Sequence, residues 1–146
     1  MSIPKFRAWD KTHSKIIKAD DILDLNLRYD EMEYQEIYQY GMNPPERDIC
    51  AGKLMEFVLM QSTGLKDKNG VEIYEGDIVK PLGFASWIGM VAYSKENAAY
   101  ILDDHNNDFR KGGNIYLSQF AEGLEIIGNI YENPELLEVR NEYCIN

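Results

Sequence analysis

The sequence predicts a mainly β fold. We expect a small barrel or sandwich core over about residues 55–131, with an N-terminal β-hairpin, an irregular or helical insertion and a short C-terminal helix. Three observations lead to this prediction. Short apolar or alternating runs recur through the second half of the chain. Glycine-containing turns separate these runs. The chain also contains 10 tyrosines, a residue type enriched in β-sheets.

The N-terminal hairpin is predicted from two short β-prone runs. Lys5–Asp10 alternates charged and apolar side chains, and Lys15–Lys18 follows after a polar connection. Such a pair, joined by a short polar loop, is typical of an antiparallel hairpin. We expect Trp9 to anchor the hairpin to the rest of the protein, a structural role that outweighs stacking on a ligand.

Residues 20–48 give two competing patterns. Tyr34, Ile37 and Tyr38 have helical spacing, whereas Met32 with Tyr34, and Tyr38 with Tyr40, alternate as in a strand. The prolines and glycine of residues 41–45 then end any regular element. The sequence alone leaves both patterns open, and the segment is predicted to be an irregular or helical insertion.

The stretch 56–80 carries the strongest local signals. Glu56–Gln61 is a continuous apolar run of strand length, which indicates a buried strand. Three glycine positions follow at which a positive φ would cost little, so turns are expected at Gly64, Asn69–Gly70 and Gly76.

Side-chain roles can be assigned to the second turn. Asp77 is expected to accept hydrogen bonds from local backbone N–H groups. We expect Tyr74 and Ile78 to face the core of the barrel. Replacing Gly76 by valine is then expected to unfold the protein rather than to silence a site.

From residue 77 onward the pattern is β throughout, followed by a short helix. Asn133 suits a helix N-cap and Pro134 suits the first helical position, so a helix is expected to open there. The expected strands are Ile78–Pro81, Trp87–Tyr93, Ala98–Leu102, Asn114–Leu117 and Leu124–Tyr131.

A soft boundary divides the chain. Residues 1–48 are expected to form the hairpin and the acidic, tyrosine-rich segment, packed on the core. Residues 49–139 are expected to form the barrel-like core and the short helix, and residues 140–146 a tail.

The net charge of −10 limits the classes of partner. Residues 1–19 hold five lysines and arginines against one aspartate, but residues 20–48 hold nine acids against two arginines. Such a surface repels phosphate backbones, so nucleic-acid binding is disfavoured, although the basic N-terminal strip leaves it open. No apolar run is long enough for a membrane span and the first residues lack a secretion signal, so a cytoplasmic protein is expected.

No reaction chemistry emerges from the motifs. Cys50 and Cys144 are expected to be free thiols, since they have no metal-ligand spacing. Asp103–Asp108 is the densest set of metal-capable side chains, but the twelfth position of a calcium loop would be Asn114 rather than glutamate. A hairpin loop is favoured there over an ion site. We expect no catalytic residue, no cofactor and no metal.

An interaction surface remains as the candidate site. One part is a small basic and aromatic patch, and the other comes from the tyrosine-rich segment. The candidate residues are Lys5, Arg7, Trp9, Lys66 and Lys68 for the patch, and Tyr34, Tyr38 and Tyr40 for the segment.

Three segments together resemble the YopX family of phage and prophage proteins. They are Lys5–Asp10, Gln61–Val79 and Ile126–Leu136, in the order and spacing typical of the family, and Gly89–Val91 fits its next strand. The resemblance spans about residues 5–138, whereas residues 20–56 fall in a part that varies. It implies a mostly β fold with a barrel-like core and the cytoplasm of a bacterium. It supplies no catalytic residue.

The expected function is that of a non-enzymatic phage or prophage accessory protein that acts as a protein-interaction module. An unknown protein partner is expected, and a homo-oligomer is left open. The alternative is a nucleic-acid-associated small-barrel module. A third alternative, an enzyme of phage nucleic-acid metabolism, requires a metal at Asp103–Asp108.

Overall fold

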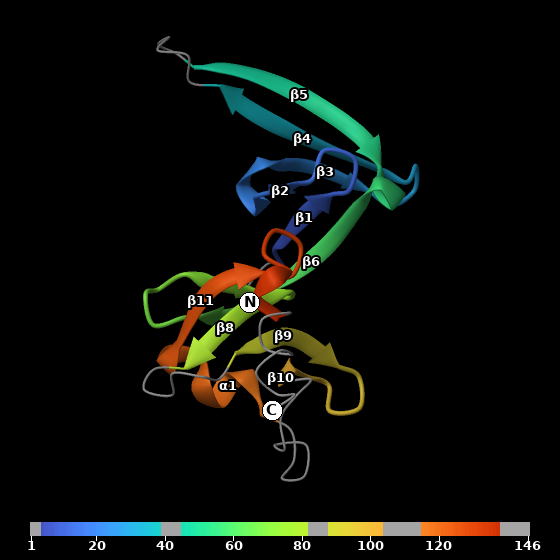
Figure 1. Ribbon diagram of the computed structural model, residues 1–146. Coiled ribbons are helices and arrows are strands. Elements are labelled where there is room, and N and C mark those ends of the chain that lie inside the picture. The colour runs from blue at the N-terminus through green and yellow to red at the C-terminus, as the bar shows by residue number, and fades with distance from the viewer. Residues whose placement is uncertain (1–3, 39–44, 82–87, 104–114, 138–146) are drawn as a thin grey trace. The chain divides into compact units, whose positions relative to one another are not determined.

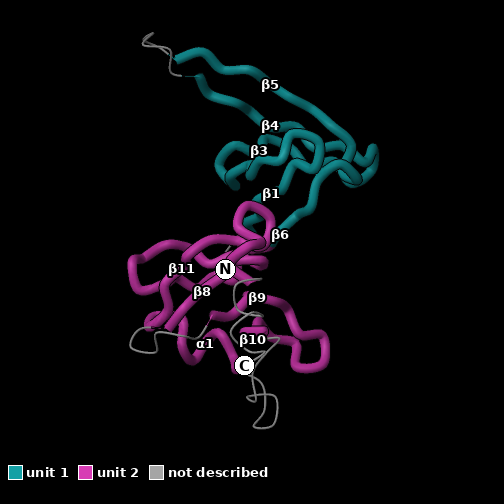
Figure 2. The backbone as a smooth tube through the Cα atoms, in the orientation of Figure 1, with its two compact units in different colours: residues 1–60 teal, residues 61–146 magenta. Residues whose placement is uncertain are grey.

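The computed structural model confirms a mainly β fold. Of the residues that the structure describes, 59% are in strands and 14% in helices, and a curled, half-barrel sheet is present. The structure describes residues 4–38, 45–81, 88–103 and 115–137. The chain forms two compact units, residues 1–60 (unit 1) and residues 61–146 (unit 2), which are coloured separately in Figure 2.

Unit 1 begins with the predicted hairpin (Figure 1). Strand β1 (Phe6–Asp10) pairs antiparallel with β2 (Lys15–Ile17), and Ala8 lies opposite Ile17. The connecting turn is held by the buried carboxylate of Asp10, which accepts hydrogen bonds from the backbone N–H groups of Thr12 at 2.9 Å and His13 at 3.2 Å. This local bonding fixes the turn geometry and therefore the hairpin register.

The described part of the predicted insertion forms a three-stranded antiparallel sheet, so a helix over residues 31–38 is wrong. After the short 3₁₀ helix η1 (Ala19–Asp21) come β3 (Ile22–Asn26), β4 (Glu31–Tyr38) and β5 (Glu46–Lys53), in the order β3-β4-β5. The alternation of β4 decides the outcome, because Met32 and Tyr34 are buried and their neighbours Glu31 and Glu33 are exposed. Residues 39–44, including Tyr40, lie outside the described residues.

A short 3₁₀ helix, η2 (Leu54–Glu56), leads from β5 into the long strand β6 (Phe57–Lys66). Phe57 and Met60 of β6 are buried, as the apolar run predicted. The division between the units falls inside this strand, after Met60. The sheet that contains β6 has the order β2-β1-β6-β7.

Each unit has its own apolar core. The core of unit 1 consists of Ala8, Ile17, Met32, Tyr34 and Phe57. The core of unit 2 consists of Ile73, Val79, Val91, Leu102, Leu117, Ala121 and Leu124. Burial of these side chains is the main stabilising contribution in each unit.

Unit 2 is built around a second four-stranded sheet, of order β10-β9-β8-β11, in which neighbouring strands are antiparallel. A short helix and a 3₁₀ turn precede its last strand (Figure 1). The elements are β7 (Glu72–Tyr74), β8 (Asp77–Pro81), β9 (Gly89–Ser94), β10 (Ala99–Asp103), α1 (Leu117–Phe120), η4 (Ala121–Gly123) and β11 (Leu124–Asn129).

A positive φ is confirmed at all three glycines, but Gly64 lies inside strand β6 (Phe57–Lys66), so the turn expected there is wrong. Gly64, Gly70 and Gly76 have φ angles of 77°, 78° and 83°, in the left-handed region that glycine adopts without a steric penalty. Asp77 accepts a hydrogen bond from the backbone N–H of Tyr74 at 2.8 Å, also as predicted.

The assignment of the core side chain of β7 is wrong by one residue. Ile73 is fully buried, whereas Tyr74 is half-buried and pairs with Ser62 of β6. Because side chains alternate along a strand, burial of Ile73 turns Tyr74 to the other face. Ile78 is fully buried, as expected.

The expected strand at Asn114–Leu117 is reduced to a single bridge between Tyr116 and Ile101, after which Leu117 opens α1. The Leu117 side chain is fully buried in the core of unit 2, but it belongs to a helix and not to a strand. Asn114 lies outside the described residues. A helical turn at residues 135–137 confirms the short helix near the C-terminus.

Candidate functional site

The basic and aromatic patch predicted from the sequence draws on both units. Lys5, Arg7 and Trp9 lie at the start of unit 1, where Trp9 is half-buried and pairs with Ile16 across the hairpin. Lys66 and Lys68 are exposed residues of unit 2, and Lys68 forms an ion pair with Glu125. The patch is therefore not one continuous surface of either unit.

The tyrosine-rich segment supplies core rather than surface. Tyr34 is only 5% exposed, and its ring packs edge-on against Phe57 with the ring centroids 5.9 Å apart. The Lys15 ammonium lies over this ring, 5.5 Å from its centroid. Burial, together with the nearby side chains of Cys50 and Asp10, raises the pKa of Tyr34 to about 12. Tyr34 is thus unavailable for contact with a partner, and Tyr38 is half-buried.

Asp10 and His13 form a polar pair at the β1–β2 turn of unit 1. The imidazole Nδ1 of His13 lies 2.7 Å from the Asp10 carboxylate. Burial by itself raises the pKa of Asp10, but hydrogen bonds from the side chain and backbone of His13 and from the backbone of Thr12 outweigh it, so the pKa lies below its usual value. The carboxylate therefore stays charged and holds the hairpin turn.

The two other signature segments, Gln61–Val79 and Ile126–Leu136, are joined to each other in unit 2. The buried Asp67 carboxylate accepts hydrogen bonds from the backbone N–H groups of Asn69 at 2.8 Å, Val71 at 2.9 Å and Ile126 at 3.2 Å. The backbone N–H of Ile130 donates to the carbonyl of Gly76 at 2.9 Å. These residues have structural roles, because their polar groups are used up in joining β11 to the turns around β7.

Among the residues that the structure describes, most of the exposed large apolar side chains belong to unit 1. Three of them, Val71, Tyr93 and Phe120, belong to unit 2. Six belong to unit 1: Leu23, Leu27, Tyr29, Ile37, Ile49 and Met55. Clustered exposed apolar groups of this kind mark contact surfaces more reliably than isolated ones do.

Three of these side chains lie at one end of unit 1, which we call the apolar end: Leu27 at 81% exposure, Tyr29 at 61% and Met55 at 73%. The turn between β3 and β4 carries the first two, and η2 carries Met55. A hydrogen bond of 3.0 Å from the backbone N–H of Leu54 to the carbonyl of Asp30 joins the two segments. The apolar end is thus a defined surface and not a set of scattered residues.

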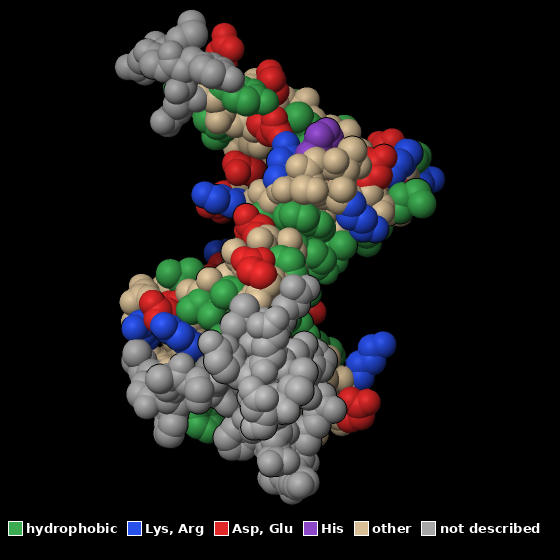
Figure 3. All heavy atoms as spheres, viewed as in Figure 1, with side chains coloured by type: hydrophobic (Ala, Val, Ile, Leu, Met, Phe, Trp, Pro, Cys, Tyr) green, Lys and Arg blue, Asp and Glu red, His purple; other side chains and the backbone are tan. Residues whose placement is uncertain are grey.

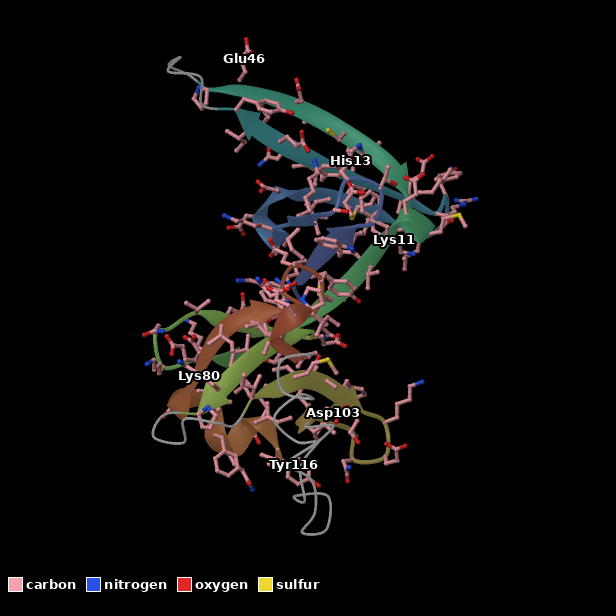
Figure 4. The ribbon with its side chains drawn as sticks, viewed as in Figure 1. Lys11, His13, Glu46, Lys80, Asp103 and Tyr116 are labelled. Carbon is pink, nitrogen blue, oxygen red and sulfur yellow. The ribbon has the colours of Figure 1, made fainter. Side chains whose placement is uncertain are left out.

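The β1–β2 turn supports the same end. The Lys11 ammonium donates to the carbonyl of Met55 at 2.8 Å, and the backbone N–H of Lys11 donates to the carbonyl of Glu56 at 3.1 Å. Figure 4 shows Lys11 and His13 on this turn, next to the junction of β5 and η2. Met55 is therefore presented on a backbone that is held on two sides.

Charges around the apolar end balance each other. The cations Lys11, Arg28 and Lys53 lie at or beside it, as do the acids Asp30, Glu31 and Glu56. Lys53 is paired with Glu31 at 3.0 Å, and the Arg28 guanidinium lies 5.8 Å from the centroid of the Tyr29 ring. In Figure 3 this end of unit 1, at the right of the view, shows hydrophobic, basic and acidic side chains intermixed. These six residues therefore give the apolar end no net charge of either sign.

Sequence reasoning missed Leu27, Tyr29 and Met55 because nothing in an apolar residue's identity says whether it is buried. One signal was available. The side-chain oxygen of Asn26 accepts hydrogen bonds from the backbone N–H groups of Arg28 and Tyr29, both at 3.1 Å. Asparagine favours such turns, and apolar residues that follow it within a turn are expected to be exposed.

The residues that the structure describes offer no group of three or more His, Cys, Asp or Glu side chains placed to hold a metal ion. Asp103 ends β10, whereas Asp104–Asp108, and with them most of the loop weighed as an ion site, lie outside those residues. Cys50 is a half-buried free thiol on β5, and Cys144 also lies outside the described residues. Across the described ranges, no helix has the length and apolar character needed to cross a membrane.

Comparison with known proteins places the chain among related sequences. A family model described as YopX protein matches residues 5–138. The crystal structure of protein EF1440 from Enterococcus faecalis is similar, with a TM-score of 0.60 and 31% sequence identity over 94% of this chain and 99% of that one. No curated protein matches the chain.

Proposed function

The chain belongs to the YopX family, and we propose that it acts as a non-enzymatic protein-interaction module, an accessory protein of a phage or prophage in the bacterial cytoplasm. The contact surface in this proposal is the apolar end of unit 1. Its partner is a protein whose own contact surface has an apolar centre and a mixed polar rim.

The observation that carries this proposal is the exposure of Leu27, Tyr29 and Met55 on one hydrogen-bonded framework. Exposing three large apolar side chains together costs solvation free energy that a folded domain ordinarily avoids. A partner that covers these three side chains recovers that solvation free energy. Methionine and tyrosine are also enriched in the centres of protein interfaces.

A protein partner fits this surface better than a nucleic acid does. Recognition of a phosphate backbone requires a surplus of cations, whereas the charges around the apolar end balance. The basic strip of the first residues is the observation that favours the alternative, a nucleic-acid-associated module. Part of that strip is already engaged within unit 1, because Lys15 forms an ion pair with Glu36 and Lys11 donates to Met55.

The test removes the apolar character of this end in the full chain. A variant carrying Leu27→Asp and Met55→Asp is compared with the unaltered protein in affinity capture from phage-bearing host cells, and each recovered partner is then purified for calorimetry. Central apolar contacts dominate interface energies, so we expect a Kd raised by about tenfold or more.

The matched control carries Val71→Asp and Phe120→Asp, which add the same two charges at exposed apolar positions of unit 2. The control is expected to bind the partner as the unaltered protein does. Equal binding by both double variants would remove the apolar end as the contact surface. A salt-sensitive electrophoretic shift with DNA or RNA that is lost on Lys5→Gln and Arg7→Gln would support the alternative instead.

A further inference from the structure

The outer edge of β5 has the features of a strand that pairs with another strand. β5 is the last strand in the sheet order β3-β4-β5, and no further strand is paired with it in the part of the chain that the structure describes. All eight of its residues are exposed or half-buried. Figure 1 shows β5 along the open side of this sheet. An edge of this kind presents a row of backbone donors and acceptors to solvent.

The centre of β5 lacks the usual protections of an edge strand. Its eight pairs with β4 run from Glu31↔Lys53 to Tyr38↔Glu46 without a register shift, so no bulge twists the edge away. Proline is absent from the strand itself. Charged residues occupy its two ends, whereas its centre, Ile49–Gly52, is uncharged. Natural edges are normally interrupted at such a centre by a charge or a bulge.

The outer face beside this edge is partly apolar. Ile49 lies opposite Gln35 and Arg47 lies opposite Ile37, so Ile37 and Ile49 are diagonal neighbours on one face. Both are about half exposed, at 51% and 52%. This face is opposite to the one that packs Tyr34 into the core and is distinct from the apolar end. The edge and the face together can accept another β-sheet as a continuation.

We propose that a second copy of this chain pairs with the β5 edge, antiparallel, with Ile49 opposite Ile49 of the copy. This pairing goes beyond the proposed function, because it uses a different surface and a different partner. Two identical strands that pair antiparallel about a twofold axis must place one residue opposite its own copy. The choice of register is therefore a choice of central residue.

Charge selects Ile49 among the candidates for this centre. A register centred on Asp48 sets two carboxylates opposite each other. A register centred on Cys50 sets Arg47 opposite Lys53 of the copy, twice. A register centred on Ala51 places the residues at the start of β5 against η2, which is a 3₁₀ turn and not a strand. The register centred on Ile49 pairs the strand from Glu46 to Gly52 and opposes no like charges.

The same register places opposite charges within reach. Arg47 of the copy lies beside Ala51, and Glu33 lies beyond Ala51 on β4. Neighbouring strands are about 4.8 Å apart, so Arg47 and Glu33 are separated by about 10 Å of backbone, which the two extended side chains span across the small Ala51. Twofold symmetry repeats this ion pair, and each pair flanks the central isoleucines.

One unfavourable contact follows from the same register. Asp48 lies opposite Cys50 of the copy and therefore diagonal to Asp48 of the copy. Like charges at this spacing weaken the pairing by a small amount. The register therefore predicts that neutralising the charge of Asp48 strengthens the dimer.

The association is expected to be weak. A single pair of strands buries less than the roughly 1,200–2,000 Å² of a standard stable interface. Sedimentation equilibrium of the full chain should therefore show a monomer at low concentration and a dimer as the concentration rises. We expect Ile49→Lys to abolish the dimer and Asp48→Asn to tighten it. Met55→Lys, at the apolar end, should leave it unchanged, which keeps this test separate from that of the proposed function.

A cross-link tests the register. In a chain carrying Cys50→Ser and Cys144→Ser, Ile49→Cys should form a disulfide-linked dimer on mild oxidation, and Met55→Cys should not. Circular dichroism checks that each variant is folded. A wild-type protein that stays monomeric at all concentrations, or a dimer that Ile49→Lys leaves intact, would overturn the proposal. Equal cross-linking at positions 49 and 55 would overturn the register.

Discussion

Gly128 illustrates how a single residue is fixed by its neighbour. A Cβ atom added at this position would lie 2.5 Å from the side-chain oxygen of Asn133 and 2.8 Å from its Cγ. That oxygen accepts a hydrogen bond from the backbone N–H of Asn129, and the side-chain oxygen of Asn129 accepts from Tyr131 and Glu132. The glycine therefore makes room for the side chain that closes the end of β11.

Gly128→Ala is expected to lower the free energy of unfolding by about 2 kcal/mol, because overpacking of a tight contact typically costs this much. Urea unfolding followed by circular dichroism measures the change. Gly123→Ala is the matched control, since a Cβ atom there meets nothing within 4 Å. That variant should be as stable as the wild type or slightly more so. Equal losses in both variants would refute the role of the Asn133 contact.

Single residues also divide into those that the sequence could predict and those that it could not. The positive φ angles of Gly64, Gly70 and Gly76 were predictable, because glycine adopts this region without a steric penalty. Tyr34 was not, because a tyrosine suits a core and an interface equally well. Its burial depends on Phe57, which lies far along the chain.

The turn between β6 and β7 depends on Asp67, an acid that is 5% exposed. Burial alone would raise its pKa, but hydrogen bonds from Val71, Ile126 and Asn69 and the charge of Lys68 lower it below its usual value. The carboxylate is thus held in its charged form. It fixes the turn and also accepts the hydrogen bond from the backbone N–H of Ile126 in β11.

This shift gives the stability a pH dependence with a definite sign. Because the pKa of Asp67 is lower in the folded than in the unfolded chain, its stabilisation is present above the unfolded pKa of about 3.9 and is lost as the pH falls through the folded pKa. Asp67→Asn should lower the free energy of unfolding by about 2 kcal/mol at neutral pH. The difference from wild type should narrow below about pH 4.

Urea titrations at several pH values test this, and Asp24→Asn, at an exposed position of β3, serves as the control. A pH-independent loss in the Asp67 variant would mean that side-chain shape, rather than charge, supports the turn.

At the scale of elements, the sequence predicted strands where one periodicity was present and failed where two competed. The hairpin, β6 and most strands of unit 2 had unmixed patterns and were found. In β4, the helical spacing of Tyr34, Ile37 and Tyr38 obscured an alternation that tertiary packing selects. The strand predicted to end at Leu117 was wrong for a different reason. A short helix can bury an apolar residue as well as a strand can, and Leu117 opens α1.

The charge of the whole molecule is unequally divided between its units. Unit 1 holds 11 acidic and eight basic residues, whereas unit 2 holds 14 acidic and seven basic residues. Repulsion among like charges opposes the compact state. The surface available for binding is likewise a property of the whole molecule, because exposure of Met55 or Ile49 depends on which strands cover which faces. A local sequence pattern could not predict it.

Added salt should therefore stabilise the protein. Sodium chloride screens repulsion between exposed carboxylates, so the urea midpoint should rise with its concentration over the range in which screening develops. Circular dichroism at each salt concentration gives the midpoints. A midpoint that falls as salt is added would show that ion pairs such as Lys68–Glu125 outweigh the repulsion.

The hydrogen bonds from β11 to the turns around β7 also determine the order in which the two units can fold during synthesis. On the ribosome, all the core residues of unit 1 have been made once Met60 has emerged. Folding of unit 2 requires residues near the end of the chain. The backbone N–H of Ile126 donates to the Asp67 carboxylate, and the backbone N–H of Ile130 donates to the carbonyl of Gly76. During that interval β8 lacks its neighbour β11, and its buried side chains remain uncovered. Nascent unit 2 is therefore the part of this protein with the greatest need of a chaperone.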